Sequence, residues 1–190
     1  MTDPKEFPQL IPPHGGYREL QSYRMAEIVF DGTVAFCDRL IDRRSRTHDQ
    51  MVQAARSGKQ NIAEGSMASG TSKKTEIKLI GVARASLEEL LIDFQDYLRQ
   101  HGLPLWGKDH AKAKEIRALA YRSNRSYTTY KTYFEEQEPE IAANAAICLI
   151  HQTNYLLDQQ LRALEKEFLK EGGFTEKLYR VRSQARKARK

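Results

Sequence analysis

The chain has 190 residues, of which 40% are hydrophobic and 29% charged, and it carries a formal net charge of +6 at pH 7. These values indicate one soluble, globular domain that is large enough to bury a core. No apolar run approaches the roughly 18 residues that a transmembrane helix needs, and residues 1–13 lack the basic and apolar regions of a secretory signal. We therefore expect a cytoplasmic protein that has no membrane partner.

The N-terminal segment, residues 1–16, contains four prolines and two glycines, which exclude a regular helix and favour a flexible, extended arm. A first helix is predicted over about 17–43, because apolar residues recur there on one helical face. These residues are Leu20, Tyr23, Val34, Cys37 and Ile41. Cys37 and the second cysteine, Cys148, are interpreted as small buried hydrophobic residues in a reducing compartment.

A second helix is predicted to begin at Thr47, which forms a capping box with Gln50. Its inner face consists mostly of small residues, which allow a neighbouring helix to approach closely. This face comprises Met51, Ala55, Gly58, Ile62 and Gly65.

A third helix is predicted after Ser72, a favourable N-cap residue, and it has the clearest apolar seam in the chain. The seam comprises Ile80, Ala83, Leu87, Leu90, Phe94 and Tyr97. We expect Gly102 to adopt the left-handed conformation past the helix end, and Pro104 prevents the helix from continuing.

Two more helices are predicted in the C-terminal half. The fourth covers about 109–134, and its inner face comprises Ile116, Ala120, Ser123, Tyr127, Tyr130 and Phe134. The fifth starts with Pro139 in its first turn and ends at Gly172 and Gly173. Its seam comprises Ile147, Ile150, Asn154, Leu157, Leu161, Leu164 and Phe168.

No long run of alternating apolar residues competes with these helical patterns. The predicted fold is therefore all-α, an antiparallel up-and-down four-helix bundle with an extra or extended C-terminal helix. The predicted organisation is an arm over 1–16, a bundle over 17–171 and a basic tail over 172–190.

The positive charge is distributed unevenly. Residues 172–190 hold seven basic residues and one acidic residue, so the tail accounts for the whole net charge. Residues 39–78 hold nine basic and four acidic side chains, whereas 132–171 hold three basic and eight acidic ones. This asymmetry suggests one surface for an anion and another for a basic partner or a sister subunit.

Two basic groups can be interpreted in two ways each. The first group is either a solvated helix end with local ion pairs or a phosphate-binding group, and it comprises Arg39, Arg43, Arg44 and Arg46. The second group, within residues 121–133, interleaves cations with aromatic residues, which is the chemistry of single-strand binding but also of a core or subunit interface. It comprises Tyr121, Arg122, Arg125, Tyr127, Tyr130, Lys131 and Tyr133.

No catalytic or metal-binding arrangement is recognisable. Residues 65–72 imitate a phosphate-binding loop but lack its lysine and a preceding strand. The five histidines form no metal-binding pattern, and His151 is interpreted as a core or interface residue. No nucleophilic triad can be assembled. We therefore expect a protein without enzymatic activity, cofactor or metal.

The stretches 50–57 (QMVQAARS), 61–65 (NIAEG) and 86–90 (SLEEL) resemble the four-helix-bundle proteins encoded in intervening sequences of large-subunit rRNA genes, in the four helix bundle suffix domain branch. The resemblance is good over about 17–100. It implies an up-and-down helical bundle, and some members assemble as pentamers. One relative, the accessory protein of diversity-generating retroelements, binds a reverse transcriptase and nucleic acid through basic surface.

Three polar residues match motif positions of this family, namely Gln50, Asn61 and Glu64, and we interpret them as contacts between helices or subunits. The chain departs from the family at Gly58 and Lys59, where Ile-Pro is usual.

The leading functional hypothesis is a non-enzymatic, homo-oligomeric accessory protein that contacts RNA or DNA phosphates through basic surface. The candidate residues are Arg43, Arg44, Arg46, Arg56, Lys59, Lys73, Lys74, Arg186, Lys187, Arg189 and Lys190. The alternative is a protein–protein scaffold whose acidic segment, 132–171, docks a basic partner such as a reverse transcriptase.

Overall fold

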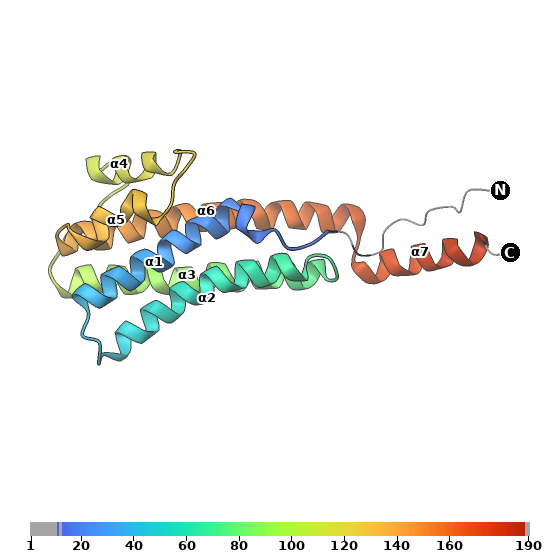
Figure 1. The fold of residues 1–190 in the computed structure, drawn as a ribbon, viewed down its shortest axis with the longest axis horizontal. Coiled ribbons are helices and arrows are strands. Elements are labelled where there is room, and N and C mark those ends of the chain that lie inside the picture. Colours follow the sequence, from blue (N-terminus) through green and yellow to red (C-terminus); the bar gives the residue numbers. More distant parts are fainter. Residues whose placement is uncertain (1–10, 12, 189–190) are drawn as a thin grey trace.

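The computed structural model describes residues 11 and 13–188, and all regular structure in that part of the chain is helical. The elements are η1 (Tyr17–Glu19), α1 (Gln21–Leu40), α2 (Arg46–Ala68), α3 (Lys73–Gln100), α4 (Ala111–Leu119), α5 (Tyr127–Glu135), α6 (Pro139–Glu171) and α7 (Phe174–Ala188). Figure 1 shows α1, α2, α3 and α6 along the long axis of the molecule, with α4 and α5 at one end and α7 beyond the other. The predicted all-helical fold is confirmed. None of the described helices is both long and apolar enough to cross a membrane.

Serine side chains set the starts of α2 and α3. Ser45 Oγ accepts a hydrogen bond from the N–H of Thr47, and Ser72 Oγ accepts one from the N–H of Thr75, both at 3.2 Å. Ser72 is therefore confirmed as an N-cap. The predicted capping box of Thr47 and Gln50 is wrong, because Ser45 already satisfies a donor of the first turn and the helix starts before Thr47.

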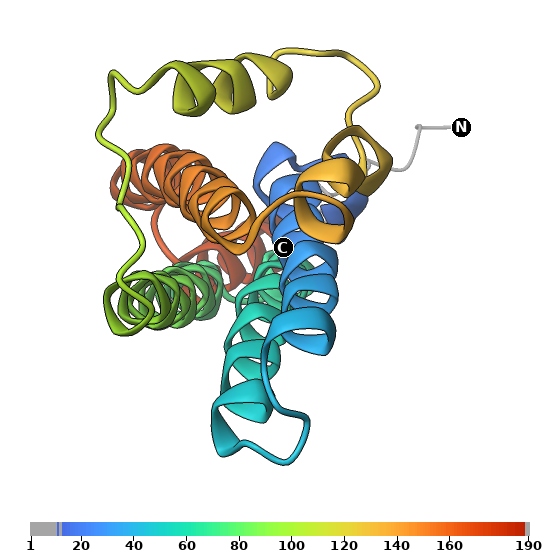
Figure 2. The ribbon, with the colours of Figure 1, turned by 90° about the vertical axis from the view of Figure 1, so that its left-hand side faces the viewer.

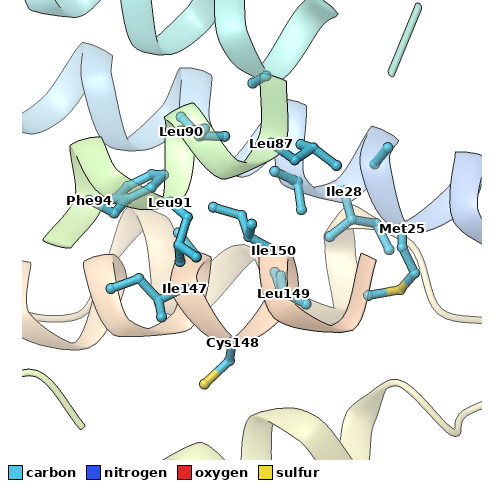
Figure 3. Close-up of a cluster of buried hydrophobic side chains, with 14 of the residues drawn as sticks. Met25, Ile28, Leu87, Leu90, Leu91, Phe94, Ile147, Cys148, Leu149 and Ile150 are labelled. Atoms are coloured by element: carbon cyan, nitrogen blue, oxygen red, sulfur yellow. The ribbon is translucent and has the colours of Figure 1, made fainter. Parts of the chain in front are cut away.

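The core lies between α1, α2, α3 and α6. All residues predicted for the inner faces of the second and third helices are buried. α6 adds an unbroken buried run from Ala142 to Ile150, and Figure 3 shows Ile147 and Ile150 opposite the apolar residues of α3. The seam of α6 weakens towards its C-terminal end, where Leu161 is only partly buried and Phe168 is 36% exposed.

Both cysteines are buried, as predicted. Cys37 lies 4.0 Å from the sulfur of Met51, and burial raises the pKa of its thiol to about 12. Figure 3 shows Cys148 on the opposite side of α6 from Ile150. It is buried there because α4 packs against α6.

The predicted fourth helix is wrong as a single element. The chain leaves the helical conformation after α4 and starts a new helix, α5, at a capping box formed by Ser126 and Thr129. Ser123 and Asn124 favour turns because their side chains compete for backbone hydrogen bonds. The break allows α5 to pack against α1, where Phe134 fills the space beside Gly32, while α4 lies across α6 (Figure 2).

The connection from α3 to α4 is fixed by Asn144 of α6, which is 1% exposed. Asn144 Oδ1 accepts a hydrogen bond from the N–H of Trp106 (2.8 Å), and Asn144 Nδ2 donates to the carbonyl of Pro104 (2.9 Å). The indole N–H of Trp106 donates to Glu140 (2.7 Å). These bonds hold the segment that precedes α4, so they help to position α4 on α6.

The two predicted terminal segments are described only in part. Most of the predicted arm, 1–16, lies outside the described residues. The backbone of Gly15, however, forms hydrogen bonds with Ser66 near the end of α2. The described part of the predicted basic tail forms α7, which follows Gly172, a glycine with a positive φ of 77°. Its position beyond the bundle in Figure 1 leaves much of its surface exposed.

Candidate nucleic-acid interface

Three of the predicted phosphate-binding residues lie at the connection between α1 and α2. Arg43 pairs with Asp38 at 3.4 Å, and Asp38 also lies 3.3 Å from the ring of His48. Arg44 and Arg46 are exposed, and neither guanidinium has an ion-pair partner within the described chain. One of these three cations is therefore partly neutralised, and two are open to an anion.

Arg56 and Lys59 project from the middle of α2 with different surroundings. Arg56 is exposed and has no ion-pair partner within residues 13–188. Lys59 Nζ lies 4.3 Å from the ring centroid of Phe30 in α1, a cation–π contact. Burial and the charge of Glu27 raise the pKa of nearby Asp31 above its usual value, and Lys59 opposes that rise without reversing it. Lys59 therefore joins two helices, and Arg56 is the better candidate for phosphate contact.

Lys73 and Lys74 begin α3 and also differ. Lys73 Nζ lies 3.0 Å from Glu76 and 3.1 Å from Glu167 of α6. Burial works to lower the pKa of Lys73, but the two carboxylates together raise it above its usual value. Lys74 is exposed and has no ion-pair partner in the described residues. Lys73 thus connects α3 with α6, which leaves Lys74 as the open cation here.

The C-terminal end of α6 and the helix α7 bring further cations close to Lys73. A cavity of about 470 Å³ between these elements is lined by Lys73, Lys170, Lys177 and Arg180, together with Glu167 and Glu171. Arg186 and Lys187 are exposed farther along α7, whereas Arg189 and Lys190 lie outside the described residues. The carboxylates reduce the positive charge of this cavity.

The predicted site is therefore divided rather than continuous. Arg46 is the first residue of α2, and Lys73 follows the other end of that helix. The 23 residues of α2 correspond to roughly 35 Å at 1.5 Å per residue. The structure brings Arg44 and Arg46 together at one end of α2, and Lys73, Lys74 and α7 together at the other.

A further basic surface lies apart from the candidate phosphate-binding residues, although Tyr121 and Arg125 in its lining belong to the second basic group of the sequence. It is an open groove of about 870 Å³ between α1, α4 and α6, called here the α4 groove. Three permanent cations line it, namely Lys114, Arg117 and Arg125, and its lining within the described chain contains no carboxylate. Two tyrosines also line it, and they are strongly exposed, Tyr121 by 90% and Tyr155 by 63%.

Two of the three cations of the α4 groove, Arg117 and Arg125, are held by neutral groups, whereas Lys114 pairs with Asp109 at 3.3 Å. The guanidinium of Arg117 donates to the carbonyl of Lys108. Arg125 donates to Gln21 Oε1 and, through Nε, to the sulfur of Met25 at 3.3 Å. Because these partners carry no charge, both arginines keep their full positive charge in the groove.

A polar group in the groove lining also lacks a partner. Gln152 Nε2 donates to the carbonyl of Arg117 at 3.1 Å, but Gln152 Oε1 is buried and accepts no hydrogen bond within the described chain. A buried acceptor without a donor costs free energy, so Gln152 is a strained point in the packing of α4 on α6.

For the aromatic segment, 121–133, the structure supports the core interpretation at three of the four tyrosines. Tyr130 is fully buried, and the hydroxyls of Tyr127 and Tyr133 donate to Glu135 and Glu115. These residues belong to the core and its margin, and Tyr121 is the exposed tyrosine of the segment. The residues of α6 that line the groove together with Tyr121 lie more than 25 residues later in the chain.

His151 and Tyr155 could have been found from their position on α6. Both are exposed in the groove, so His151 is not a core residue, and its interpretation as an interface residue stays a prediction. They are four residues apart and lie outside the apolar seam of α6, which predicts a shared outer face.

The polar residues that match the family motif have separate positions. Asn61 donates to Ser57 in the same helix, and Ser57 Oγ lies 3.0 Å from Ser86 Oγ in α3, so this set connects α2 and α3. Gln50 and Glu64 are exposed, so neither connects helices within the described chain. Their interpretation as contacts between subunits stays a prediction.

Within the described residues, no group of three or more His, Cys, Asp and Glu side chains is arranged to hold a metal ion. Comparison with family models, with curated proteins and with solved structures gave no match for the chain.

Proposed function

We propose that this protein is a non-enzymatic accessory protein that contacts nucleic-acid phosphates through its basic surface. The observation that carries the proposal is the exposure of Arg44, Arg46 and Arg56 without a carboxylate partner within the described chain. A guanidinium that is not paired internally can bind a phosphate through two parallel hydrogen bonds. Contacts of this kind give affinity without base recognition.

We further propose that α1, α2, α3 and α6 form an antiparallel up-and-down bundle. Several copies of the protein then associate in the cytoplasm, as the resemblance to the rRNA intervening-sequence proteins implies. A homo-oligomer would repeat the basic patches and strengthen binding to a long polyanion. Analytical ultracentrifugation measures this, and a monomer at all concentrations contradicts it.

The decisive experiment is a salt titration of RNA and DNA binding, followed by fluorescence anisotropy. Neutralisation of phosphates by lysine and arginine releases counterions, so the affinity must fall as salt rises. The variant Arg44→Glu/Arg46→Glu should bind more weakly and show a shallower salt dependence. Binding that is absent or insensitive to salt contradicts the proposal.

A matched control comes from α6. The variant Arg162→Glu/Lys166→Glu changes the net charge by the same amount, but these two exposed cations lie in the acidic segment, 132–171. It should bind more tightly than Arg44→Glu/Arg46→Glu. Equal losses in the two variants would show that only net charge matters and would contradict a site at Arg44 and Arg46.

One observation favours the alternative function, a scaffold for a basic protein. The outer end of α6 exposes Leu169 by 77% and Phe168 by 36% beside the carboxylate of Glu165. Apolar surface next to acidic groups suits a basic, amphipathic segment of a partner such as a reverse transcriptase. A pulldown that retains such a partner after nuclease treatment supports this function, and loss of the partner after nuclease supports the first one.

A further inference from the structure

We propose that the α4 groove binds an unpaired segment of single-stranded nucleic acid, with bases stacked on Tyr121 and Tyr155 and phosphates placed on Arg117 and Arg125. This inference rests on the proposed function, because it names the class of nucleic acid that the protein takes.

The two tyrosines of the α4 groove are unusually exposed. A large aromatic side chain is normally placed where its ring is covered, yet 90% of Tyr121 and 63% of Tyr155 remain exposed. Neither hydroxyl makes a hydrogen bond within residues 13–188, in contrast to Tyr127 and Tyr133, which are fixed by carboxylates. Exposed rings in a concave surface provide stacking platforms for any base, since every base has a π-face.

The lining of the α4 groove is positively charged. Of the three cations that line the groove, Arg117 and Arg125 are held only by uncharged groups, and Lys114 pairs with Asp109 at 3.3 Å, outside the lining. A concave surface with cations and no lining carboxylate concentrates positive potential. Aromatic rings beside such a potential match the alternating base and phosphate of a single strand.

The volume of the α4 groove favours one form of nucleic acid. The volume of about 870 Å³ lies within the range of roughly 300–1,000 Å³ that is usual for ligand clefts. It can receive exposed bases, whereas a duplex keeps its base faces covered and offers only phosphates and base edges.

The position of the groove suits this role. Figure 2 shows α4 lying across α6, with the 120–126 connection leading from α4 to α5 beside α1. Tyr121 belongs to this connection and Tyr155 to the long α6. Tyr121 therefore lies in a turn, and Tyr155 lies in a helix of the core.

The test compares single-stranded oligonucleotides with duplexes of the same sequence, using fluorescence anisotropy on the full chain. Tyr121→Ala/Tyr155→Ala should bind the single strand at least about tenfold more weakly, the loss expected for one stacked base. Its duplex affinity should match that of the wild type. Tyr121→Phe/Tyr155→Phe keeps both rings and should restore single-strand binding. Because both tyrosines are exposed, neither change should lower the melting temperature.

Each other outcome contradicts the inference. Unchanged single-strand affinity in the double alanine variant means that the tyrosines do not stack on bases. An equal loss for duplex and single strand assigns the effect to general phosphate contact. If AMP alone binds as tightly as the oligonucleotide and competes with it, the groove is a site for free nucleotides.

The result also separates this inference from the proposed function. Salt-sensitive binding that Arg44→Glu/Arg46→Glu weakens, without any effect of the tyrosine changes, supports the proposed function and overturns the groove. Absence of binding to all nucleic acids overturns both.

Discussion

Gly58 of α2 faces Leu87 of α3 so closely that a Cβ atom on Gly58 would lie 2.7 Å from Cδ2 of Leu87. Leu87 is fully buried and cannot move without disturbing the core. Gly58→Ala should therefore destabilise the protein by about 1–3 kcal/mol, the usual cost of overpacking, although alanine favours the helix. Urea unfolding measures the change.

Gly81 provides the matched comparison. It also lies inside a helix, but a Cβ atom there would meet nothing within 4 Å. Gly81→Ala should therefore stabilise the protein by about 0.5–1 kcal/mol, because alanine loses less backbone freedom than glycine on folding. Changes of the same sign at both positions would show that the approach of α2 and α3 is not what requires Gly58.

Truncation of two leucines in predicted seams should have unequal effects. Leu87 is fully buried, and Leu87→Ala should cost about 2–5 kcal/mol of unfolding free energy. Leu161 is only partly buried at the weakening seam of α6, so Leu161→Ala should cost clearly less. Equal losses in thermal or urea unfolding would mean that Leu161 is covered in solution, as an interface between subunits would cover it.

The ion pair between Lys73 and Glu76 should be visible as a pH-dependent stability. Lys73→Met leaves the buried carboxylate of Glu76 without its nearest cation and should destabilise the protein by about 1–3 kcal/mol at neutral pH. In a Glu76→Gln background the same change should cost less, because no charge is left unpaired.

Acid should reduce the cost of Lys73→Met. Burial already raises the pKa of Glu76 above 4.5, and Lys73 opposes that rise. Without Lys73 the folded pKa rises further, so the folded variant binds a proton that the unfolded chain does not, and its stability relative to wild type increases as the pH falls towards 4.5. A cost that stays constant between neutral and acidic pH contradicts this account.

Alkaline solution should weaken the packing of α5. Burial and the hydrogen bond to Glu115 raise the pKa of Tyr133 from 10.0 to about 12. The unfolded chain then loses this proton first, so stability falls as the pH rises from 10 to 12. Tyr133→Phe removes the titrating group and should show a smaller decrease in the same urea series. An equal decrease would assign the alkaline loss to other residues.

The amount of this fold that can be predicted from sequence follows the strength of each helical pattern. The seam from Ile80 to Tyr97 has regular steps of three and four residues, and every member is buried. The segment 109–134 has apolar residues at similar steps, but Ser123 is exposed and the chain turns there. Local turn chemistry at 123–126 outweighs a weak apolar pattern, because few buried groups would be lost by the break.

The candidate site shows a different limit. Sequence identified Arg44 and Arg46 as a dense group because they are neighbours in the chain, and exposure keeps them open. It could not show that Lys73 is held by Glu167, which lies on another helix more than 90 residues away. The α4 groove combines Tyr121 with Tyr155 through the packing of α4 on α6, which no local pattern encodes.

Trp106 is the single tryptophan of the chain. Its ring stacks on His110 with centroids 4.4 Å apart, and the segment that carries it leads directly into α4. Tryptophan emission from the unlabelled protein therefore originates at this one corner. A shift of its wavelength would report the loosening of α4 from α6 separately from unfolding of the remaining helices.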